Sequence, residues 1–305
     1  MKNIIEVSHL TKQYGEFKAV DDISFEVEEG SIFAFLGPNG AGKSSTINML
    51  CTITDKTSGT VLINGHDLEK EKDKVRKDIG IVFQESTIDE SQTVEENLKY
   101  HCSFYHVPKE EVKERIDFVL DLVDMTKWRK SIVGSLSGGM KRRVEIARGL
   151  VHYPKVLFLD EPTTGLDPQT RANIWEYIQK LQKDKNITIF LTTHYMDEAE
   201  VCSKIVIMDH GKIVACDTPD KLKKTYTSTK IQMDCSDNKK LEELLKNQNL
   251  KYMKEDHKYI VCARNGNHAL NILETCKPYI QDFEVKKGTI NDAFLEITGR
   301  EIREA

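Results

Sequence analysis

The eight residues Gly37–Ser44 constrain the fold of this chain more than any other stretch. They read Gly-Pro-Asn-Gly-Ala-Gly-Lys-Ser, with the apolar run Ile32–Leu36 before them and a helical pattern reaching Met49 after Ser45. Spaced glycines ending in Lys-Ser are typical of a loop that joins a buried strand to a helix. Such a loop curls its backbone around phosphate oxygens, and the helix start adds partial positive charge. The stretch therefore predicts an α/β fold with a nucleotide-phosphate site between a strand and a helix.

Every residue of this loop, together with Ser45 after it, is expected to take part in ATP binding: Gly37, Pro38, Asn39, Gly40, Ala41, Gly42, Lys43, Ser44 and Ser45. The ammonium of Lys43 should reach the β- and γ-phosphates, and the hydroxyl of Ser44 should bind Mg²⁺. A second motif, Asp160-Glu161, ends the apolar strand Val156–Leu159. A carboxylate at Asp160 suits the Mg²⁺ shell, and Glu161 is placed to orient and polarise an attacking water. ATP and Mg²⁺ are the cofactors that these residues predict.

A third motif, Leu136-Ser137-Gly138-Gly139, lies one helix ahead of that strand. A serine hydroxyl and free N–H groups at a helix start form an anion site. The motif stands too far along the chain to serve obviously as a second phosphate loop for the same nucleotide.

Alternating strands and helices predict a mostly parallel sheet in residues 1–220, with antiparallel strands near the start and a helical insert at about 88–152. Residues 221–305 form a smaller accessory domain with the order β-α-β-β-α-β, which is typical of a ferredoxin-like α+β unit. Its central hairpin is expected to turn at Asp256-His257, and Thr289 is expected to cap the closing helix.

Composition excludes several classes of function. The net charge of −5 and pI near 6.0 give no basic field, so no nucleic-acid partner is expected. The apolar runs are much shorter than the roughly 20 residues that a membrane helix needs. The first residues lack the apolar core of a signal peptide. The seven cysteines show no C-x-x-C pair, so we expect reduced thiols, no metal cluster and a cytoplasmic location.

The three motifs, in the order in which they follow one another along the chain, resemble those of the ATP-binding subunits of ABC transporters, over residues 1 to about 220. The resemblance implies an ATPase of which two identical copies face head to tail around two ATP molecules. It also implies that Ser137, Gly138 and Gly139 bind the γ-phosphate of the ATP held by the opposite copy. A membrane partner would convert this cycle into transport.

Four further positions match the family one at a time. Tyr14 matches an aromatic residue that stacks on adenine. Gln84, at the end of the strand Ile79–Phe83, matches a glutamine that contacts Mg²⁺ and senses the membrane partner. Asp167 matches a loop that communicates between the two sites. His194 matches a histidine that contacts the γ-phosphate and holds the catalytic carboxylate and water in place, which makes it, with Glu161 and Gln84, part of the expected catalytic set.

Met140 departs from the family pattern, since many members have glutamine there. The phosphate-binding groups belong to the three preceding residues, so we expect binding to survive. Three stretches resemble the daunorubicin-resistance branch of exporters: Met140–Arg143, Thr163–Arg171 and Phe294–Gly299. That resemblance implies export of drugs or other amphipathic compounds through a separate ABC-2-type membrane permease, with this subunit on the cytoplasmic face of the membrane.

Other interpretations stay open at this point. One is a non-transport ABC ATPase that acts as a mechanical switch on ribosomes, DNA or an assembly complex. The ribosome-acting kind usually carries two ATPase domains in tandem, whereas this chain has one set of motifs. A regulatory ATP-binding module is disfavoured by the presence of both Glu161 and His194. An importer, or an exporter of lipid, polysaccharide or peptide, is hardly separable by sequence. The transported substrate is not encoded here.

Overall fold

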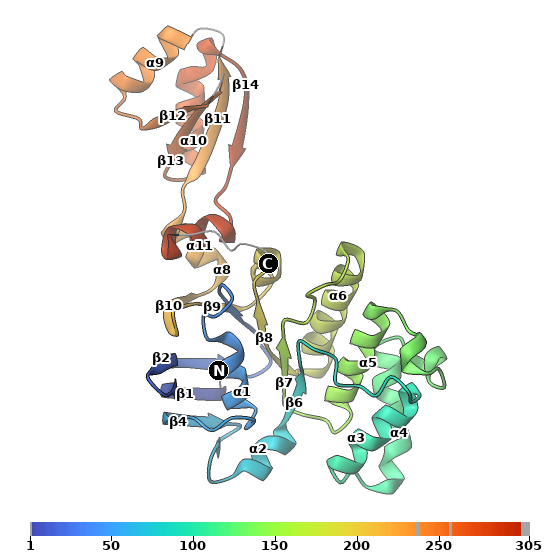
Figure 1. The fold of residues 1–305 in the computed structure, drawn as a ribbon. Coiled ribbons are helices and arrows are strands. Elements are labelled where there is room, and N and C mark those ends of the chain that lie inside the picture. Colours follow the sequence, from blue (N-terminus) through green and yellow to red (C-terminus); the bar gives the residue numbers. More distant parts are fainter. Residues whose placement is uncertain (1, 236–237, 256–257, 300–305) are drawn as a thin grey trace. The chain divides into compact units, whose positions relative to one another are not determined.

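The computed structural model describes residues 2–235, 238–255 and 258–299 (Figure 1). The chain divides into two compact units, one within residues 1–216 and one within residues 217–301. In the described part of the chain, no helix has both the length and the apolar character needed to cross a membrane.

The first unit begins with an antiparallel sheet in the order β2-β1-β4-β5. Its strands are β1 Asn3–Tyr14, β2 Phe17–Glu28, β4 Ser58–Ile63 and β5 His66–Asp67. The turn between the last two strands is Asn64-Gly65, and both residues have positive φ, 49° and 79°. Asparagine and glycine tolerate that conformation, which a two-residue hairpin turn requires.

The second sheet has the order β10-β9-β3-β8-β7-β6. Its strands are β3 Ile32–Leu36, β6 Ile79–Val82, β7 Val156–Asp160, β8 Thr188–Thr193, β9 Lys204–Asp209 and β10 Lys212–Asp217. The five strands from β9 to β6 run parallel. Every residue of β3, β7 and β8 is buried, as is usual for a parallel sheet covered on both faces. This confirms the predicted α/β core.

A cluster of aromatic rings joins the two sheets. The ring of Phe25 in β2 lies 5.0 Å from that of Phe35 in β3, and Phe35 lies 5.1 Å from Phe190 in β8. Phe158 in β7 continues the cluster at 5.1 Å from Phe190. These edge-to-face and tilted contacts each add to the burial of large apolar surface. They fix the parallel strands, and hence the ends of those strands, against the antiparallel sheet.

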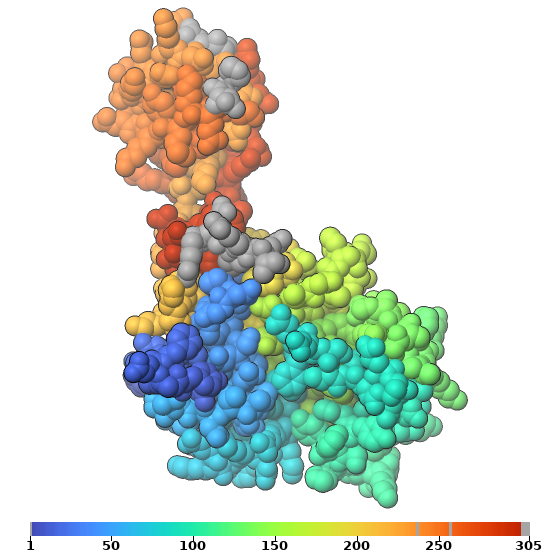
Figure 2. All heavy atoms as spheres, in the orientation of Figure 1, coloured from blue at the N-terminus to red at the C-terminus, as the bar shows by residue number. Residues whose placement is uncertain are grey.

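The helices of the first unit surround this core. They are α1 Lys43–Leu50, α2 Lys72–Asp78, α3 Val94–Phe104, α4 Lys109–Leu122, α5 Gly138–Leu150, α6 Pro168–Lys185 and α7 Met196–Glu200. The first helix begins at Lys43, inside the glycine-rich motif, so the prediction that it follows Ser45 is wrong. Helices α3, α4 and α5 form the helical insert, on the side of this unit away from β1 and β2 (Figure 1). Figure 2 shows the same separation at the surface, with the green atoms of the insert apart from the blue atoms of the first strands.

The second unit contains a four-stranded antiparallel sheet in the order β12-β13-β11-β14. Its elements are α8 Pro219–Tyr226, β11 Thr229–Cys235, α9 Asn238–Asn247, β12 Tyr252–Glu255, β13 Lys258–Ala263, α10 Gly266–Cys276, β14 Ile280–Lys286 and α11 Ile290–Thr298. The order from β11 to β14 is β-α-β-β-α-β, as predicted for a ferredoxin-like unit. Thr289 caps α11, accepting the N–H of Asp292 at 3.1 Å. The predicted turn at Asp256-His257 lies outside the described residues.

Candidate nucleotide-binding site

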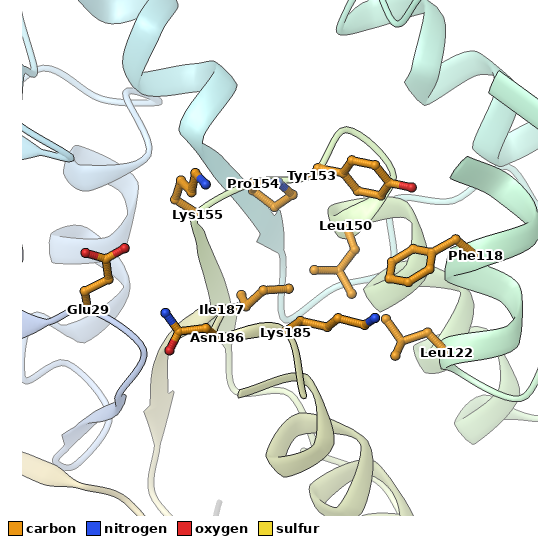
Figure 3. A pocket seen from close by; sticks show the side chains of 10 residues that line it. All are labelled: Glu29, Phe118, Leu122, Leu150, Tyr153, Pro154, Lys155, Lys185, Asn186 and Ile187. Carbon is orange, nitrogen blue, oxygen red and sulfur yellow. The ribbon is translucent and has the colours of Figure 1, made fainter. Parts of the chain in front are cut away.

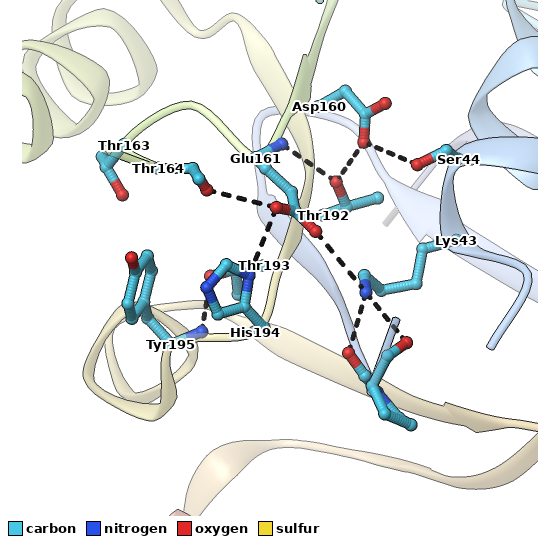
Figure 4. A network of polar contacts seen from close by, with 12 residues as sticks. Lys43, Ser44, Asp160, Glu161, Thr163, Thr164, Thr192, Thr193, His194 and Tyr195 are labelled. Atoms are coloured by element: carbon cyan, nitrogen blue, oxygen red, sulfur yellow. Dashed lines mark hydrogen bonds and ion pairs between the residues drawn. The ribbon is translucent and has the colours of Figure 1, made fainter. Parts of the chain in front are cut away.

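The carboxyl ends of three neighbouring parallel strands meet at one edge of the second sheet. Leu36 at the end of β3 lies in register with Thr193 in β8, and Thr192 lies in register with Asp160 at the end of β7. Ligands of open α/β sheets bind at this edge. The register therefore gathers the residues that follow these strands, although they are far apart in sequence. Figure 4 shows Lys43, Asp160, Glu161 and His194 around one space.

Backbone crowding makes the glycine-rich loop specific for glycine at two positions. Gly42 has φ 107°, and a Cβ atom there would lie 2.5 Å from the carbonyl oxygen of Ala19. A Cβ on Gly37 would lie 2.4 Å from the carbonyl oxygen of Met208. The carbonyl of Ala41 accepts the N–H of Gly211 at 3.0 Å, which ties the loop to the turn after β9. The loop is thus a rigid, side-chain-free cradle of the kind that fits phosphate.

Lys43 is buried inside this loop and leaves only 4% of its surface exposed. Its ammonium donates to the carbonyl oxygens of Gly37 at 2.8 Å and Pro38 at 3.2 Å, and it lies 3.6 Å from Oε1 of Glu161. Burial lowers the pKa of the ammonium, and the charge of Glu161 opposes that shift. The positive charge is therefore held within the loop, at the place where the motif predicts phosphate groups.

Ser44 and Asp160 lie together at the mouth of the loop. The hydroxyl of Ser44 donates to Oδ1 of Asp160 at 3.3 Å, and the hydroxyl of Thr192 donates to the same oxygen at 2.5 Å. Mg²⁺ prefers such oxygen ligands and is commonly held by one or two carboxylates together with substrate phosphates. The hydroxyl and carboxylate present therefore fit the ion that the sequence predicts.

Gln84 is placed differently from the sequence-based prediction. Strand β6 ends at Val82, so Gln84 lies in a bend two residues beyond the strand, and the prediction that it ends the strand is wrong. Its side chain is exposed, and no described hydrogen bond joins it to Ser44 or Asp160. The short strand follows from its neighbour, because β6 pairs with β7 only over Ile79–Val82.

Glu161 takes an unusual backbone conformation at the end of β7. Its φ of 46° lies in the left-handed region, which non-glycine residues seldom occupy outside turns and functional sites. Its N–H donates to the hydroxyl of Thr192 at 3.0 Å. The carboxylate, 7% exposed, accepts the hydroxyl of Thr164 at 3.1 Å and lies 3.2 Å from Nδ1 of His194. The backbone turn thus directs this carboxylate to the space beside Lys43.

The surroundings of Glu161 favour its ionised form. The ring of His194, the ammonium of Lys43 and the hydroxyl of Thr164 hold the pKa of this carboxyl below its usual range, against the effect of burial. Nδ1 of His194 lies at ion-pair distance from this carboxylate, and the ring packs 4.2 Å from that of Tyr195. At neutral pH the site contains a carboxylate that can accept a proton or a water hydrogen bond.

The Ser-Gly-Gly motif and Asp167 each begin a helix. Ser137 caps α5 and accepts the N–H of Met140 at 3.4 Å, and Asp167 caps α6 and accepts the N–H of Thr170 at 3.0 Å. A Cβ atom on Gly139 would lie 2.3 Å from the side chain of Thr170, so the two helix starts are close neighbours. Hydrogen bonding to Thr170 lowers the pKa of the Asp167 carboxyl.

The Ser-Gly-Gly motif and Asp167 do not come together with the glycine-rich loop and Glu161 of the same chain. Ser137 and Gly138 are exposed, and no described hydrogen bond or ion pair joins them to Lys43, Ser44 or Glu161. Tyr14 is likewise an exposed ring at the end of β1, with the ammonium of Lys12 over it at 4.7 Å. The structure therefore assembles one half of the predicted site in this copy and leaves the other half on its surface.

Arg142 is a buried residue of this site that sequence reasoning missed. On α5, its guanidinium donates to the carbonyl oxygens of Phe83 at 2.6 Å and Pro162 at 2.7 Å, and more weakly to those of Asp160 and Glu161. It also pairs with the buried carboxylate of Glu145 at 2.7 Å. One side chain thus links the helix that Ser137 begins to the backbone at the ends of β6 and β7. The available signal in the sequence was the spacing of three residues between Arg142 and Glu145, which allows an ion pair on one helix face.

Three hydroxyls and one carboxylate form a second unpredicted group. Glu198 on α7, 2% exposed, accepts the hydroxyls of Thr163 and Thr193. The hydroxyl of Thr192 joins the two acidic residues, since it donates to Asp160 and accepts from Glu161. These contacts fix the loop after β7 to the end of β8. The run Thr192-Thr193 in a buried strand was the only sequence signal, because buried hydroxyls need partners.

A pocket of about 340 Å³ lies elsewhere on the first unit (Figure 3). It is lined by Phe118 and Leu122 of α4 and by Pro154, Asn186 and Ile187, which stand just ahead of β7 and β8. The pocket is therefore at the amino ends of the strands, opposite the edge where the predicted site residues gather. It contains none of those residues and does not belong to the nucleotide site.

Comparison with known proteins places this geometry in a family. The family model described as ABC transporter matches residues 20–164. The Escherichia coli strain K12 protein described as a probable multidrug ABC transporter ATP-binding protein, YbhF, is 39% identical over 73% of this chain. The aligned part is only 38% of the length of that relative.

A second relative matches over nearly its whole length. The daunorubicin/doxorubicin resistance ATP-binding protein DrrA of Streptomyces peucetius is 34% identical, with 97% of this chain and 92% of that protein aligned. Among solved structures, the dimeric structure of MJ0796, described as a bacterial ABC transporter cassette, is 28% identical with a TM-score of 0.64. The alignment covers 70% of this chain and 98% of the MJ0796 chain. The chain belongs to the ATP-binding proteins of the ABC transporter family.

Proposed function

We propose that the chain is the ATP-hydrolysing subunit of an ABC-2-type exporter of drugs or other amphipathic compounds. The observation that carries the proposal is the constellation at the strand ends, where Glu161 lies between the ammonium of Lys43 and the ring of His194. The ferredoxin-like unit would be an accessory domain, so that residues 1–220 bind ATP and residues 221–305 serve another role. The name of the DrrA relative supports the choice of drug export.

The residues divide the chemistry between them. Lys43 would leave the loop carbonyls for the β- and γ-phosphates and stabilise the negative charge on the transferred group. Glu161 would orient the attacking water and accept its hydrogen bond, and His194 would hold that carboxylate and the γ-phosphate in line. Ser44, Asp160 and Gln84 would hold Mg²⁺, which neutralises charge on the phosphates when bound.

The exposed Ser-Gly-Gly helix start supports a site shared by two copies. Ser137 and Gly139 lie at the N-terminus of α5, where N–H groups and the helix dipole favour an anion. Since they do not contact Lys43 of the same copy, they are available to the ATP of a second copy placed head to tail. The dimeric form of the MJ0796 relative supports this arrangement. A separate membrane permease, with this subunit bound to it at the cytoplasmic face of the membrane, would couple closure and opening of the dimer to export.

Glu161→Gln tests the catalytic assignment. The amide keeps the shape of the side chain but cannot act as a base, so steady-state ATP turnover should fall roughly 100-fold or more. Nucleotide binding, measured by fluorescence of a labelled ATP, should persist. Glu176→Gln, at an exposed position of α6, is the matched control and should keep wild-type turnover. Turnover of the Glu161 variant near the wild-type rate would show that another group does this work.

The permease partner has a separate test. The tagged chain, purified from membranes of its own organism in mild detergent, should bring down a membrane chain of the ABC-2 type. Addition of the candidate drug should then change ATP turnover of the complex. Recovery of the chain without any membrane protein, or only with ribosomes, would contradict the exporter assignment.

A further inference from the structure

The accessory sheet has an open edge along β14. In the order β12-β13-β11-β14, this strand pairs with β11 on one side, and no strand among the described residues pairs with its other side (Figure 1). An edge strand presents backbone N–H and C=O groups that can pair with another chain. The opposite edge, β12, has four residues, whereas β14 has seven. The longer edge is therefore the better template for pairing.

An apolar groove runs beside this edge. Phe283 and Val285 lie in register with Met233 and Ile231, which belong to the buried core on the helix side of the sheet. Yet Phe283 is 53% exposed and Val285 is 41% exposed. Together with Leu270 and Leu273 of α10 they line a hollow of about 440 Å³. Apolar surface gathered along an unpaired strand marks an interaction site more often than an isolated exposed residue does.

The charged residues on the other face of β14 can pair with the same residues of a second copy. Asp282, Glu284 and Lys286 alternate with the apolar residues and point away from the helices. Antiparallel pairing of two β14 strands about Glu284 sets Asp282 of each copy opposite Lys286 of the other. Because the arrangement is two-fold symmetric, this ion pair forms twice, and Phe283 faces Val285 twice.

Other registers are less favourable. Pairing about Phe283 would set Asp282 opposite Glu284. Pairing about Val285 would set Glu284 opposite Lys286, but it would replace both Phe283–Val285 contacts by Phe283 opposite Lys287. In the favoured register the two Glu284 carboxylates meet, but each already has Lys286 of its own strand at 3.0 Å. The N–H of Phe283 now donates to the carboxylate of Asp282 at 2.8 Å. A second strand would supply a carbonyl for that N–H and an ammonium for that carboxylate.

We infer that β14 is a self-association surface, through which two copies of this chain join their accessory sheets into one antiparallel sheet of eight strands. The contact goes beyond the proposed function, because it uses neither ATP nor the Ser-Gly-Gly loop. It keeps two subunits together while the nucleotide site is open. Failure of the catalytic tests above would leave it standing, and the reverse also holds.

Disulfide trapping tests the register. In the full chain without nucleotide, Glu284→Cys places two thiols opposite each other at about 4.5–5.5 Å between Cα atoms, within the range of a disulfide. Mild oxidation should give a cross-linked dimer on a non-reducing gel. Lys286→Cys faces Asp282 and should not cross-link, whereas Asp282→Cys combined with Lys286→Cys should. The wild type, in which Cys216 and Cys262 are exposed, gives the background. Equal cross-linking of Glu284→Cys and Lys286→Cys, or none above background, would overturn the register.

Charge reversal tests the contact by sedimentation of the full chain without nucleotide. Asp282→Lys and Lys286→Asp each replace two attractions by two repulsions, so each should weaken the dimer by about tenfold or more. The double reversal restores the crossed pairs and should restore the dimer. A wild-type monomer at every concentration, or reversals without effect, would overturn the proposal. Cross-linking of Glu284→Cys only to a co-expressed membrane chain would assign the edge to that partner instead.

Discussion

Replacement of Arg142 by methionine should destabilise the first unit more than any comparable change on the same helix. The guanidinium is 6% exposed, and it supplies hydrogen bonds to Glu145 and to backbone carbonyls at the ends of β6 and β7. Methionine fills a similar length but donates nothing. The carboxylate of Glu145, 3% exposed, then stays buried without its partner. Breaking one side of such a buried pair costs about 3–5 kcal/mol, a large share of the 5–15 kcal/mol typical of a folded protein.

Urea unfolding followed by tryptophan fluorescence measures this loss. Both tryptophans, Trp128 and Trp175, lie in the first unit, so the signal reports on the unit that contains Arg142. Arg143→Met is the matched control. Arg143 makes one distant ion pair, 3.9 Å from exposed Asp124, and lies over the ring of Tyr177, which together contribute about 1 kcal/mol.

A second variant separates the lost charge partner from the lost carbonyl contacts. Arg142→Met combined with Glu145→Leu removes the unpaired carboxylate and should recover much of the stability. ATP turnover of the double variant should stay low, because the backbone of Glu161 would still lack its support. A loss below about 1 kcal/mol for Arg142→Met, or equal losses at Arg142 and Arg143, would refute the reasoning.

Two further predictions follow from the same structure. Thr192→Val removes the hydroxyl that joins Asp160 to Glu161, so ATP turnover should fall by roughly tenfold while nucleotide binding persists. The control Thr188→Val, at the start of the same strand, should leave ATP turnover unchanged. Equal effects of the two substitutions on turnover would show that only strand stability was lost. Burial lowers the pKa of His152 to about 4, so below pH 6.5 this residue binds a proton in the unfolded chain before it does so in the folded chain. The contribution of His152 to stability should therefore be full above pH 6.5 and fall by up to about 2 kcal/mol by pH 5, as unfolding at several pH values would show. His152→Phe should reduce the slope of stability with pH, and part of the slope should remain because burial also lowers the pKa of His101, to about 3. An unchanged slope would assign it to other groups.

The sequence reveals the site well where its residues are contiguous and of unusual type. The Gly37–Ser44 loop, Asp160-Glu161 and Ser137–Gly139 each combine a rare spacing with a strand or helix boundary, so their positions at strand ends and helix starts were predictable. Alternation of apolar residues was enough for the sheets and for the β-α-β-β-α-β order of the accessory unit. What each loop does in the cell is a separate question, which rests on the proposed function.

The parts that sequence could not supply depend on contacts between strands. Thr192 looks like any buried threonine until β8 pairs with β7 and sets its hydroxyl beside Asp160. Arg142 reads as one of three basic residues in a row, and only its helical phase turns it inward. Gln84 was misplaced because the end of a strand is fixed by where its neighbour stops pairing, which one strand alone does not encode. The groove beside β14 was invisible for a related reason, since exposure of an edge is a property of the whole sheet.

A mixing experiment tests the central claim, that each ATP site combines residues of two copies. Lys43→Ala inactivates the phosphate loop with which a copy binds its own ATP. Ser137→Arg inactivates the Ser-Gly-Gly loop that contacts the ATP of the partner copy. Each variant alone should therefore lack ATP turnover. When the two are mixed, a dimer with one copy of each contains one intact site. Since about half of the dimers are mixed and each keeps one of its two sites, turnover should recover to roughly a quarter of the wild-type value. A mixture that stays as inactive as its parents would contradict the shared site.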